Sequence, residues 1–108
     1  MTILKNEEDF MAQFQPIHEK DKKRFALYDG ESEIGYLSYT EQAPGVISAD
    51  HTIVHPEYEG QGHAGRLLDA IVAYAREENL KIIPICAYVK KRFNEDPEAF
   101  QDVRAELA

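Results

Sequence analysis

Hydrophobic and polar residues alternate along the first half of the chain, and this spacing predicts β-strands. Alternating or β-branched runs favour strands over residues 17–19, 24–28, 33–40 and 46–54. The pairs Asp29-Gly30 and Pro44-Gly45 supply turns, and a charged run over residues 20–23 separates the first two strands. Strands joined by such short connections pair antiparallel, so this half of the chain predicts a mostly antiparallel sheet.

From Ala64 the spacing changes to that of an amphipathic helix. Apolar residues recur three and four positions apart up to Ala75, and Asn79 suits a left-handed C-terminal position, which predicts a helix over residues 64–79. The apolar run 81–86 then predicts a strand that lies parallel to its neighbour after a right-handed crossover. Because Pro84 has no N–H, we expect this strand at an edge of the sheet, or beside a gap where it parts from its neighbour.

The ends of the chain carry further helical signals. Residues 6–14 start with Asn6 as an N-cap and place apolar residues at helical spacing. Residues 87–94 predict a second helix, and Asp96-Pro97 can start a third within a tail that otherwise frays. We therefore divide the chain into an N-terminal helical extension over residues 1–15 and an α+β domain over residues 16–108.

Length and charge exclude several classes of protein. The 108 residues are enough for one domain, expected as a monomer or a small homo-oligomer. A formal net charge of −8 argues against nonspecific binding to nucleic acid or to an anionic membrane surface. The sequence contains no apolar run long enough to span a bilayer and no signal peptide at its start. The single cysteine, Cys86, favours a reducing compartment, so we expect a cytoplasmic protein.

A glycine-rich turn joins the fourth predicted strand to the main helix. Glycines at 60, 62 and 65 let the backbone approach a ligand closely, and the unpaired N–H groups of the following helix point at the turn. These features indicate an anion site for a phosphate group. The alternative is a tight strand-to-helix turn without a ligand. A P-loop is disfavoured because no Gly-Lys-Ser/Thr ending is present, and the antiparallel strands disfavour a dinucleotide fold.

The order of these elements resembles the acetyl-CoA-binding half of the GNAT acetyltransferase superfamily. The resemblance is strongest to its small, minimal N-acetyltransferases, which lack the usual N-terminal substrate-binding helices. Two segments carry it, ADHTIV over residues 49–54 and IPICAYV over residues 83–89, and it covers roughly residues 17–95. It implies a GNAT-like fold, acetyl-CoA as the cosubstrate and an amine as the acetyl acceptor.

The superfamily's pyrophosphate loop reads Arg or Gln, two residues, Gly, one residue, then Gly or Ala. Gly62 and Ala64 fill its last two places, whereas Glu59 occupies the first and would repel phosphate if its side chain faced the ligand. Such loops bind mainly through backbone N–H groups, so an outward-facing acid is tolerated. The resemblance implies cofactor contacts from Ile53, Val54, His55, Glu59, Gly60, Gln61, Gly62, His63, Ala64, Gly65, Arg66, Tyr88 and Lys91.

Cys86 ends the last predicted strand immediately before a helix, whose N-terminus favours the thiolate. If the resemblance holds, the acetyl thioester lies near this sulfur. The thiolate then either takes the acetyl group and passes it to an amine, or only lines the pocket while the amine attacks directly. A buried structural cysteine is the alternative.

His51 is the predicted partner of Cys86, as a general base on the thiol or on an incoming ammonium group. Because Ile47, Ala49 and Ile53 share its side of the predicted strand, the alternative is a core histidine bonded to a backbone carbonyl. The four histidines and one cysteine do not have the paired spacing of zinc ligands, so no metal site is predicted.

The helix predicted over residues 87–94 carries two further candidates for the site. Tyr88 can donate a proton to the leaving CoA thiolate, as a tyrosine near this position does in many GNAT enzymes. The basic run over residues 90–92 is either a solvated helix face or a contact with the cofactor.

The sequence therefore predicts an acetyl-CoA-dependent N-acetyltransferase with Cys86 and His51 as its catalytic pair. The absence of the usual N-terminal helices leaves the acceptor side open, which suits a protein amine or a small polyamine. The alternative is a noncatalytic CoA-binding or protein-interaction module on the same fold.

Overall fold

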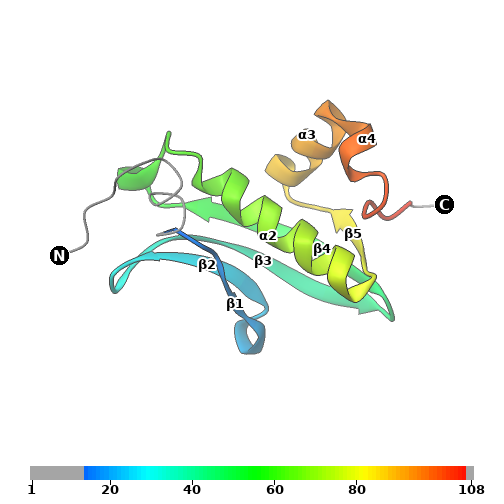
Figure 1. Cartoon of the computed structure of the whole chain (residues 1–108), viewed down its shortest axis with the longest axis horizontal. Coiled ribbons are helices and arrows are strands. Elements are labelled where there is room, and N and C mark those ends of the chain that lie inside the picture. The colour runs from blue at the N-terminus through cyan, green and yellow to red at the C-terminus, as the bar shows by residue number, and fades with distance from the viewer. Residues whose placement is uncertain (1–13, 107–108) are drawn as a thin grey trace.

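The computed structural model describes residues 14–106 as a five-stranded sheet with helices packed against it (Figure 1). The strands are β1 (Ile17–Glu19), β2 (Arg24–Asp29), β3 (Ser32–Ala43), β4 (Val46–Val54) and β5 (Lys81–Pro84). The helices are α2 (His63–Glu78), α3 (Ala87–Glu95) and α4 (Pro97–Phe100), with 3-10 turns η1 (Lys20–Lys22) and η2 (Pro56–Tyr58). Strand order in the sheet follows chain order. A mostly antiparallel sheet with helices packed against it confirms the predicted α+β class.

The first four strands pair antiparallel and β5 pairs parallel to β4, as the spacing of the sequence predicted. β3 runs on to Ala43, beyond the predicted end at residue 40, whereas β5 stops at Pro84 rather than at residue 86. The helix predicted over residues 6–14 lies almost wholly outside the described residues. None of the helices in the described chain is long and apolar enough to span a membrane.

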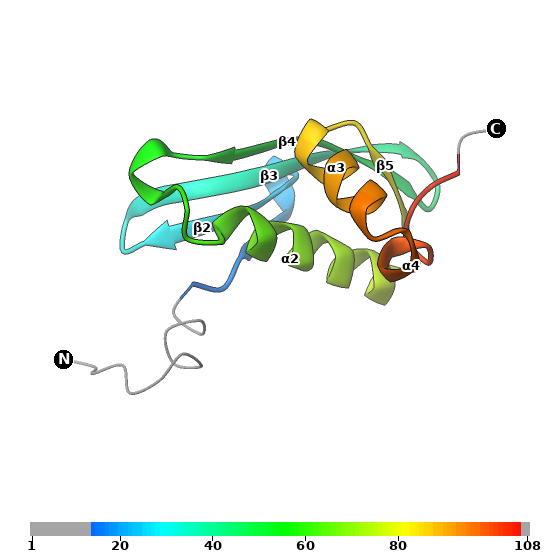
Figure 2. The ribbon, with the colours of Figure 1, turned by 90° about the horizontal axis from the view of Figure 1, so that it is seen from above.

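The helix α2 lies across one face of the sheet, and the described chain has no helix on the opposite face (Figure 2). Its apolar stripe is buried against β2, β3 and β4. The helix ends at Asn79, which adopts the expected left-handed conformation with φ of 56°. The core consists mainly of apolar side chains from α2, α3 and the sheet face beneath them.

An irregularity in β4 changes which of its residues face the helices. Tyr39 pairs with Ala49 and Ser38 pairs with His51, so Asp50 is an extra residue without a partner on β3. Its carboxylate instead accepts hydrogen bonds from the hydroxyls of Thr40, at 2.5 Å, and of Ser48, at 2.7 Å. This β-bulge shifts the alternation of side chains along the rest of β4.

The outer edge of β5 explains where that strand ends. The N–H of Ile82 donates to the carbonyl of Val103 at 2.6 Å, and the N–H of Ala105 donates to the carbonyl of Ile82 at 2.9 Å. Pro84 cannot extend this ladder because it has no N–H. Pro84 lies in the edge strand of the sheet and forms the last pair with β4, opposite Ala49. This confirms the expected position of the proline at an edge where the strand parts from its neighbour.

Candidate active site

β4 and β5 separate at the carboxyl end of their pairing. The carbonyl of Ala49 accepts hydrogen bonds from the N–H groups of Ile85, at 3.1 Å, and Cys86, at 2.8 Å. Beyond this point β4 continues to Val54 without a neighbouring strand on the β5 side within residues 14–106. We call the space beside residues 50–54 of β4 the β4–β5 split. An extended ligand with amide groups can pair with the free strand edge there.

Cys86 lies at the base of this split as the N-cap residue of α3. Its side chain is buried, and its sulfur forms a 3.3 Å hydrogen bond with the hydroxyl of Thr52, which bridges the narrow end of the split. Burial acts to raise the pKa of the thiol, but the hydrogen bonds with Thr52 and with the N–H groups of Val89 and Tyr88 outweigh it, so the pKa lies below its ordinary value. This environment favours the thiolate.

The structure places Thr52, and not the predicted partner His51, against the sulfur of Cys86. Neighbouring residues of a strand point to opposite faces, and the residue that meets the sulfur is Thr52. His51 and Ile53 are exposed, so His51 is not a core histidine either. The expectation failed because the bulge at Asp50 reverses the alternation on which it depended. The sequence carries no clear sign of that bulge, and so the role of Thr52 was missed.

The glycine turn, residues 59–65, leads from η2 into α2. Gly60 and Gly62 have φ angles of 76° and 82°, which only glycine adopts readily. The first intrahelical bond runs from the N–H of Arg66 to the carbonyl of Gly62, so the N–H groups of His63 and Ala64 precede it. No side chain of residues 14–106 caps the helix, and its first turn contains no acid. Within the described part of the chain, the positive end of α2 is therefore open to an anion.

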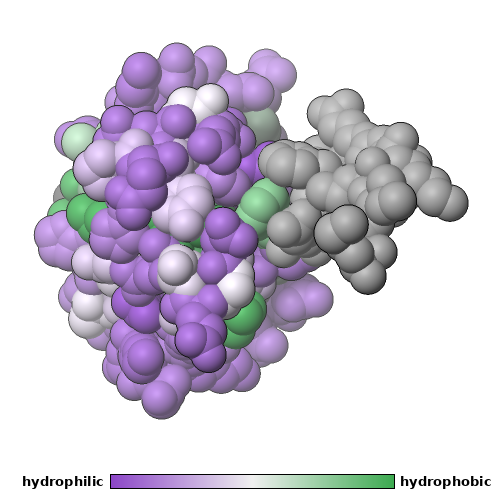
Figure 3. Space-filling view, turned by 90° about the vertical axis from the view of Figure 1, so that its left-hand side faces the viewer, coloured by the Kyte–Doolittle hydropathy of each residue, from purple (hydrophilic) through white to green (hydrophobic). Residues whose placement is uncertain are grey.

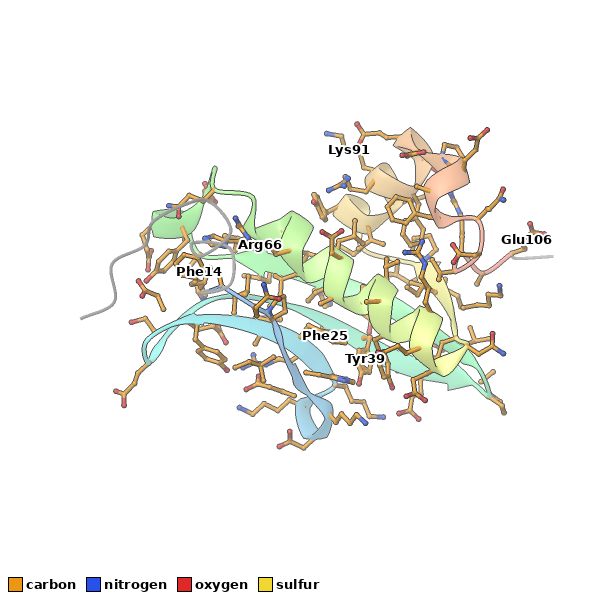
Figure 4. All side chains as sticks on the ribbon, viewed as in Figure 1. Phe14, Phe25, Tyr39, Arg66, Lys91 and Glu106 are labelled. Carbon is orange, nitrogen blue, oxygen red and sulfur yellow. The ribbon has the colours of Figure 1, made fainter. Side chains whose placement is uncertain are left out.

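Arg66 folds back over this turn. Its Nη1 donates to the carbonyl of Gln61 at 2.8 Å and lies 3.1 Å from Nδ1 of His63. The buried Nε of Arg66 has no hydrogen-bond partner among the described residues. Figure 4 shows the Arg66 side chain at the start of α2, near Phe14. The guanidinium thus adds positive charge beside the free N–H groups.

His63, one of the implied cofactor contacts, is buried beneath the turn. Its ring lies edge-on to Phe14 and to Tyr58, with centroids 5.3 and 6.4 Å apart. Burial and the nearby charge of Arg66 lower the pKa of His63. The neutral ring can therefore accept the Arg66 hydrogen bond at Nδ1, which supports the turn from below.

The other predicted contacts lie at the end of β4 and in the glycine turn. Glu59 and Gln61 are exposed, so the acid at the first motif position has room to face solvent. Nε2 of His55 lies 2.8 Å from a carboxylate oxygen of Glu33 at the start of β3. Val54 ends β4 on the edge of the split.

Two side chains of α3 reach the first turn of α2. A Cβ added to Gly65 would lie 3.6 Å from Nη1 of Arg92 and 3.8 Å from the hydroxyl of Tyr88. Arg92 donates to that hydroxyl at 2.7 Å. Lys91, the predicted contact, is exposed, and Figure 4 shows it on the side of α3 away from α2. The sequence left the role of the basic run 90–92 open and favoured Lys91 within it, since helical spacing alone does not orient α3 against α2.

The end of the molecule that carries the glycine turn is mostly hydrophilic, with only small hydrophobic patches among the described residues in view (Figure 3). This surface suits a polar, charged ligand better than an apolar partner.

A separate hollow of about 590 Å³ opens at the outer edge of β5, where Pro84 ends the ladder with the C-terminal segment.

Comparison with known families and proteins agrees with this geometry. Residues 24–103 match the family described as GCN5-related N-acetyl-transferase. The chain is 28% identical over 81 residues to Protein NATD1 of Mus musculus, covering 74% of each chain. It is 27% identical over 90 residues to Protein NATD1 of Danio rerio, covering 82% of each.

Solved structures show the same relationship. A GCN5-like protein from Staphylococcus aureus, determined by NMR, has a TM-score of 0.67 and 33% identity, covering 91% of this chain and 94% of that one. A ribosomal-protein-alanine N-acetyltransferase from Brucella melitensis has a TM-score of 0.51 and 20% identity, covering 99% of this chain and 76% of that one. The second likeness concerns the fold alone.

Proposed function

Because this chain belongs to the GCN5-related N-acetyltransferase family, we propose that it transfers the acetyl group of acetyl-CoA to an amine. One observation carries the proposal. The unpaired part of β4 begins beside the thiol of Cys86 and leads, through η2 and the glycine turn, to the start of α2. The start of α2 suits the diphosphate of the cosubstrate, and the thiol of Cys86 suits its thioester.

The residues present fit acetyl-CoA. The start of α2 offers free N–H groups and the Arg66 guanidinium, which can hold the diphosphate. The free edge of β4 offers backbone groups that can pair with the amides of the pantetheine arm. The thiol of Cys86 lies at the far end, where the thioester would arrive.

Two routes use the same residues. In the first, the Cys86 thiolate attacks the thioester carbonyl carbon, the bond to the CoA sulfur breaks, and CoA leaves as a thiolate that takes a proton. The acceptor amine then attacks the acetyl-cysteine, which forms the amide and regenerates the thiol. In the second route the amine attacks acetyl-CoA directly and Cys86 lines the pocket. The lowered pKa of Cys86 supports the first route without a histidine partner.

His51 is then assigned to the acceptor rather than to the thiol. It lies exposed on the sheet face opposite Thr52, and that face has no helix in the described chain. From there its imidazole can take the proton that the amine loses as it attacks. The open face leaves room for an acceptor as large as a protein chain or as small as a polyamine. A free thiol at Cys86 fits a reducing compartment such as the cytoplasm.

The proposal is tested by mixing the protein with acetyl-CoA, quenching, and measuring the intact mass. We expect an acetyl adduct that is absent from Cys86→Ala. Thr52→Val removes a hydrogen bond that lowers the thiol pKa, so the adduct should form more slowly at neutral pH and recover at higher pH. His51→Gln should form the adduct at the normal rate but slow its transfer to an added amine.

The outcomes separate the alternatives. Turnover without an adduct, retained in Cys86→Ala, would establish direct attack. Binding of CoA with neither adduct nor turnover across a panel of amines would favour a noncatalytic module. A protein that does not bind acetyl-CoA at all would refute the proposal.

A further inference from the structure

The five arginines of this chain differ in whether an acid neutralises them. Arg24 and Arg76 form ion pairs with carboxylates, and Arg104 donates to the amide oxygen of Asn94. Arg66 and Arg92 have no carboxylate within 4.0 Å among residues 14–106. These two are also the arginines that lie beside the first turn of α2.

Considered over residues 14–106, this placement is electrostatically unfavourable without a ligand. The N-terminus of a helix carries a partial positive charge, and cations are normally preferred at the other end. The first turn of α2 contains no acid that could offset the two guanidinium groups. An anion bound between them would remove this repulsion.

The geometry around Gly65 shows how Arg92 would reach such an anion. Its Nη1 and the hydroxyl of Tyr88 both lie in ordinary contact distance of the position that a side chain on Gly65 would take. Arg92 donates to the Tyr88 oxygen, and its Cζ lies 5.8 Å from the centre of that ring. Tyr88 therefore orients the guanidinium, and its own hydroxyl proton stays free to donate to a ligand.

We propose that Arg92, held in place by Tyr88, binds the diphosphate of CoA across the start of α2. This inference rests on the function proposed above. It moves Tyr88 from a proton donor at the CoA sulfur to the phosphate end of the site. It also distinguishes Arg92 from the exposed Lys90 and Lys91 of the same basic run, neither of which lies near Gly65.

The test measures binding by calorimetry for CoA, for 3′-dephospho-CoA and for S-acetylpantetheine, which has no phosphate. Arg92→Ala should weaken CoA and 3′-dephospho-CoA equally, by roughly tenfold or more, because a charge-assisted hydrogen bond is lost. Tyr88→Phe should weaken both less, and Arg92→Lys should recover part of the loss. Weak binding of S-acetylpantetheine should be the same for every variant.

The control is Lys90→Ala, which removes a charge from an exposed position of the same helix and should leave all three affinities unchanged. Thermal unfolding checks that each variant is folded. A loss confined to CoA would overturn the assignment and place Arg92 on the 3′-phosphate, and normal CoA binding by Arg92→Ala would also overturn it. If the wild-type protein binds no CoA, it is the proposed function that fails.

Discussion

Gly65 has no side chain at the point where two side chains of α3 reach the first turn of α2. Its backbone is helical, and an added Cβ would make only ordinary contacts with Arg92 and Tyr88. Gly65→Ala should therefore stabilise the helix by about 0.5–1 kcal/mol and raise the melting temperature by a few degrees. The same methyl group fills the space assigned to the diphosphate, so calorimetry should show weaker CoA binding.

Gly45→Ala provides the opposite control. Gly45 lies in the turn between β3 and β4 with open space around it, but its φ of 78° strains any other residue. We expect a loss of about 1 kcal/mol in stability with unchanged CoA affinity. If Gly65→Ala bound CoA as tightly as the wild type, the diphosphate could not lie against the start of α2.

The buried His63 makes stability depend on pH. Its pKa is lowered from the ordinary 6.5 by burial and by Arg66, so the folded state binds fewer protons than the unfolded state below that pH. The free energy of unfolding should therefore fall as pH drops below about 6.5 and level off below the folded-state pKa. His18, whose pKa is also lowered by burial, adds to the same slope.

His63→Asn isolates the contribution of this ring. Asparagine keeps an acceptor for the Arg66 guanidinium but does not titrate. Denaturant titrations between pH 5 and pH 7.5 should show a smaller dependence on pH in the variant than in the wild type. An identical dependence in both proteins would mean that His63 is protonated as easily when folded as when unfolded.

At the scale of elements, β4 depends on a close approach of its backbone to β3. Gly35 pairs with Val54, and a Cβ at this position would overlap the carbonyl oxygen of Ile53. Because backbone cannot move aside as a side chain can, Gly35→Ala should destabilise the protein by about 1–3 kcal/mol. Thermal unfolding measures this loss, and CoA binding should weaken as well, because the end of β4 leads into the glycine turn.

A variant as stable as the wild type would show that β3 and β4 can separate there without cost. The comparison with Gly45→Ala is informative, since that glycine has a strained backbone angle but no overlap. Gly35→Ala should be the more damaging of the two.

The elements also show where sequence patterns are reliable. The apolar spacing predicted α2 to within one residue at each end, because one face of a helix must be buried along its whole length. The alternation along β4 predicted the strand but not its faces. A single extra residue at Asp50 reversed them, which moved His51 to the exposed face and Thr52 to the thiol.

At the scale of the whole molecule, the arrangement divides the proposed reaction between two sides of the sheet. The helices lie toward one side of the sheet (Figure 2), Cys86 belongs to the core beneath them, and His51 is exposed. The β4–β5 split joins the two sides in the plane of the sheet. In the proposed reaction, this division would give the cosubstrate and the acceptor separate routes to the same carbonyl carbon.

The sequence by itself determined the order of the elements, the glycine turn and the position of Cys86 between a strand and a helix. These depend on spacing and turn chemistry within short stretches of chain. The tertiary structure decided that Thr52 meets the thiol, that His63 is buried, and that Arg92 rather than Lys91 lies beside Gly65. Such contacts depend on how separate elements pair and approach one another, and no local pattern records the register of a bulged strand or the angle between two helices.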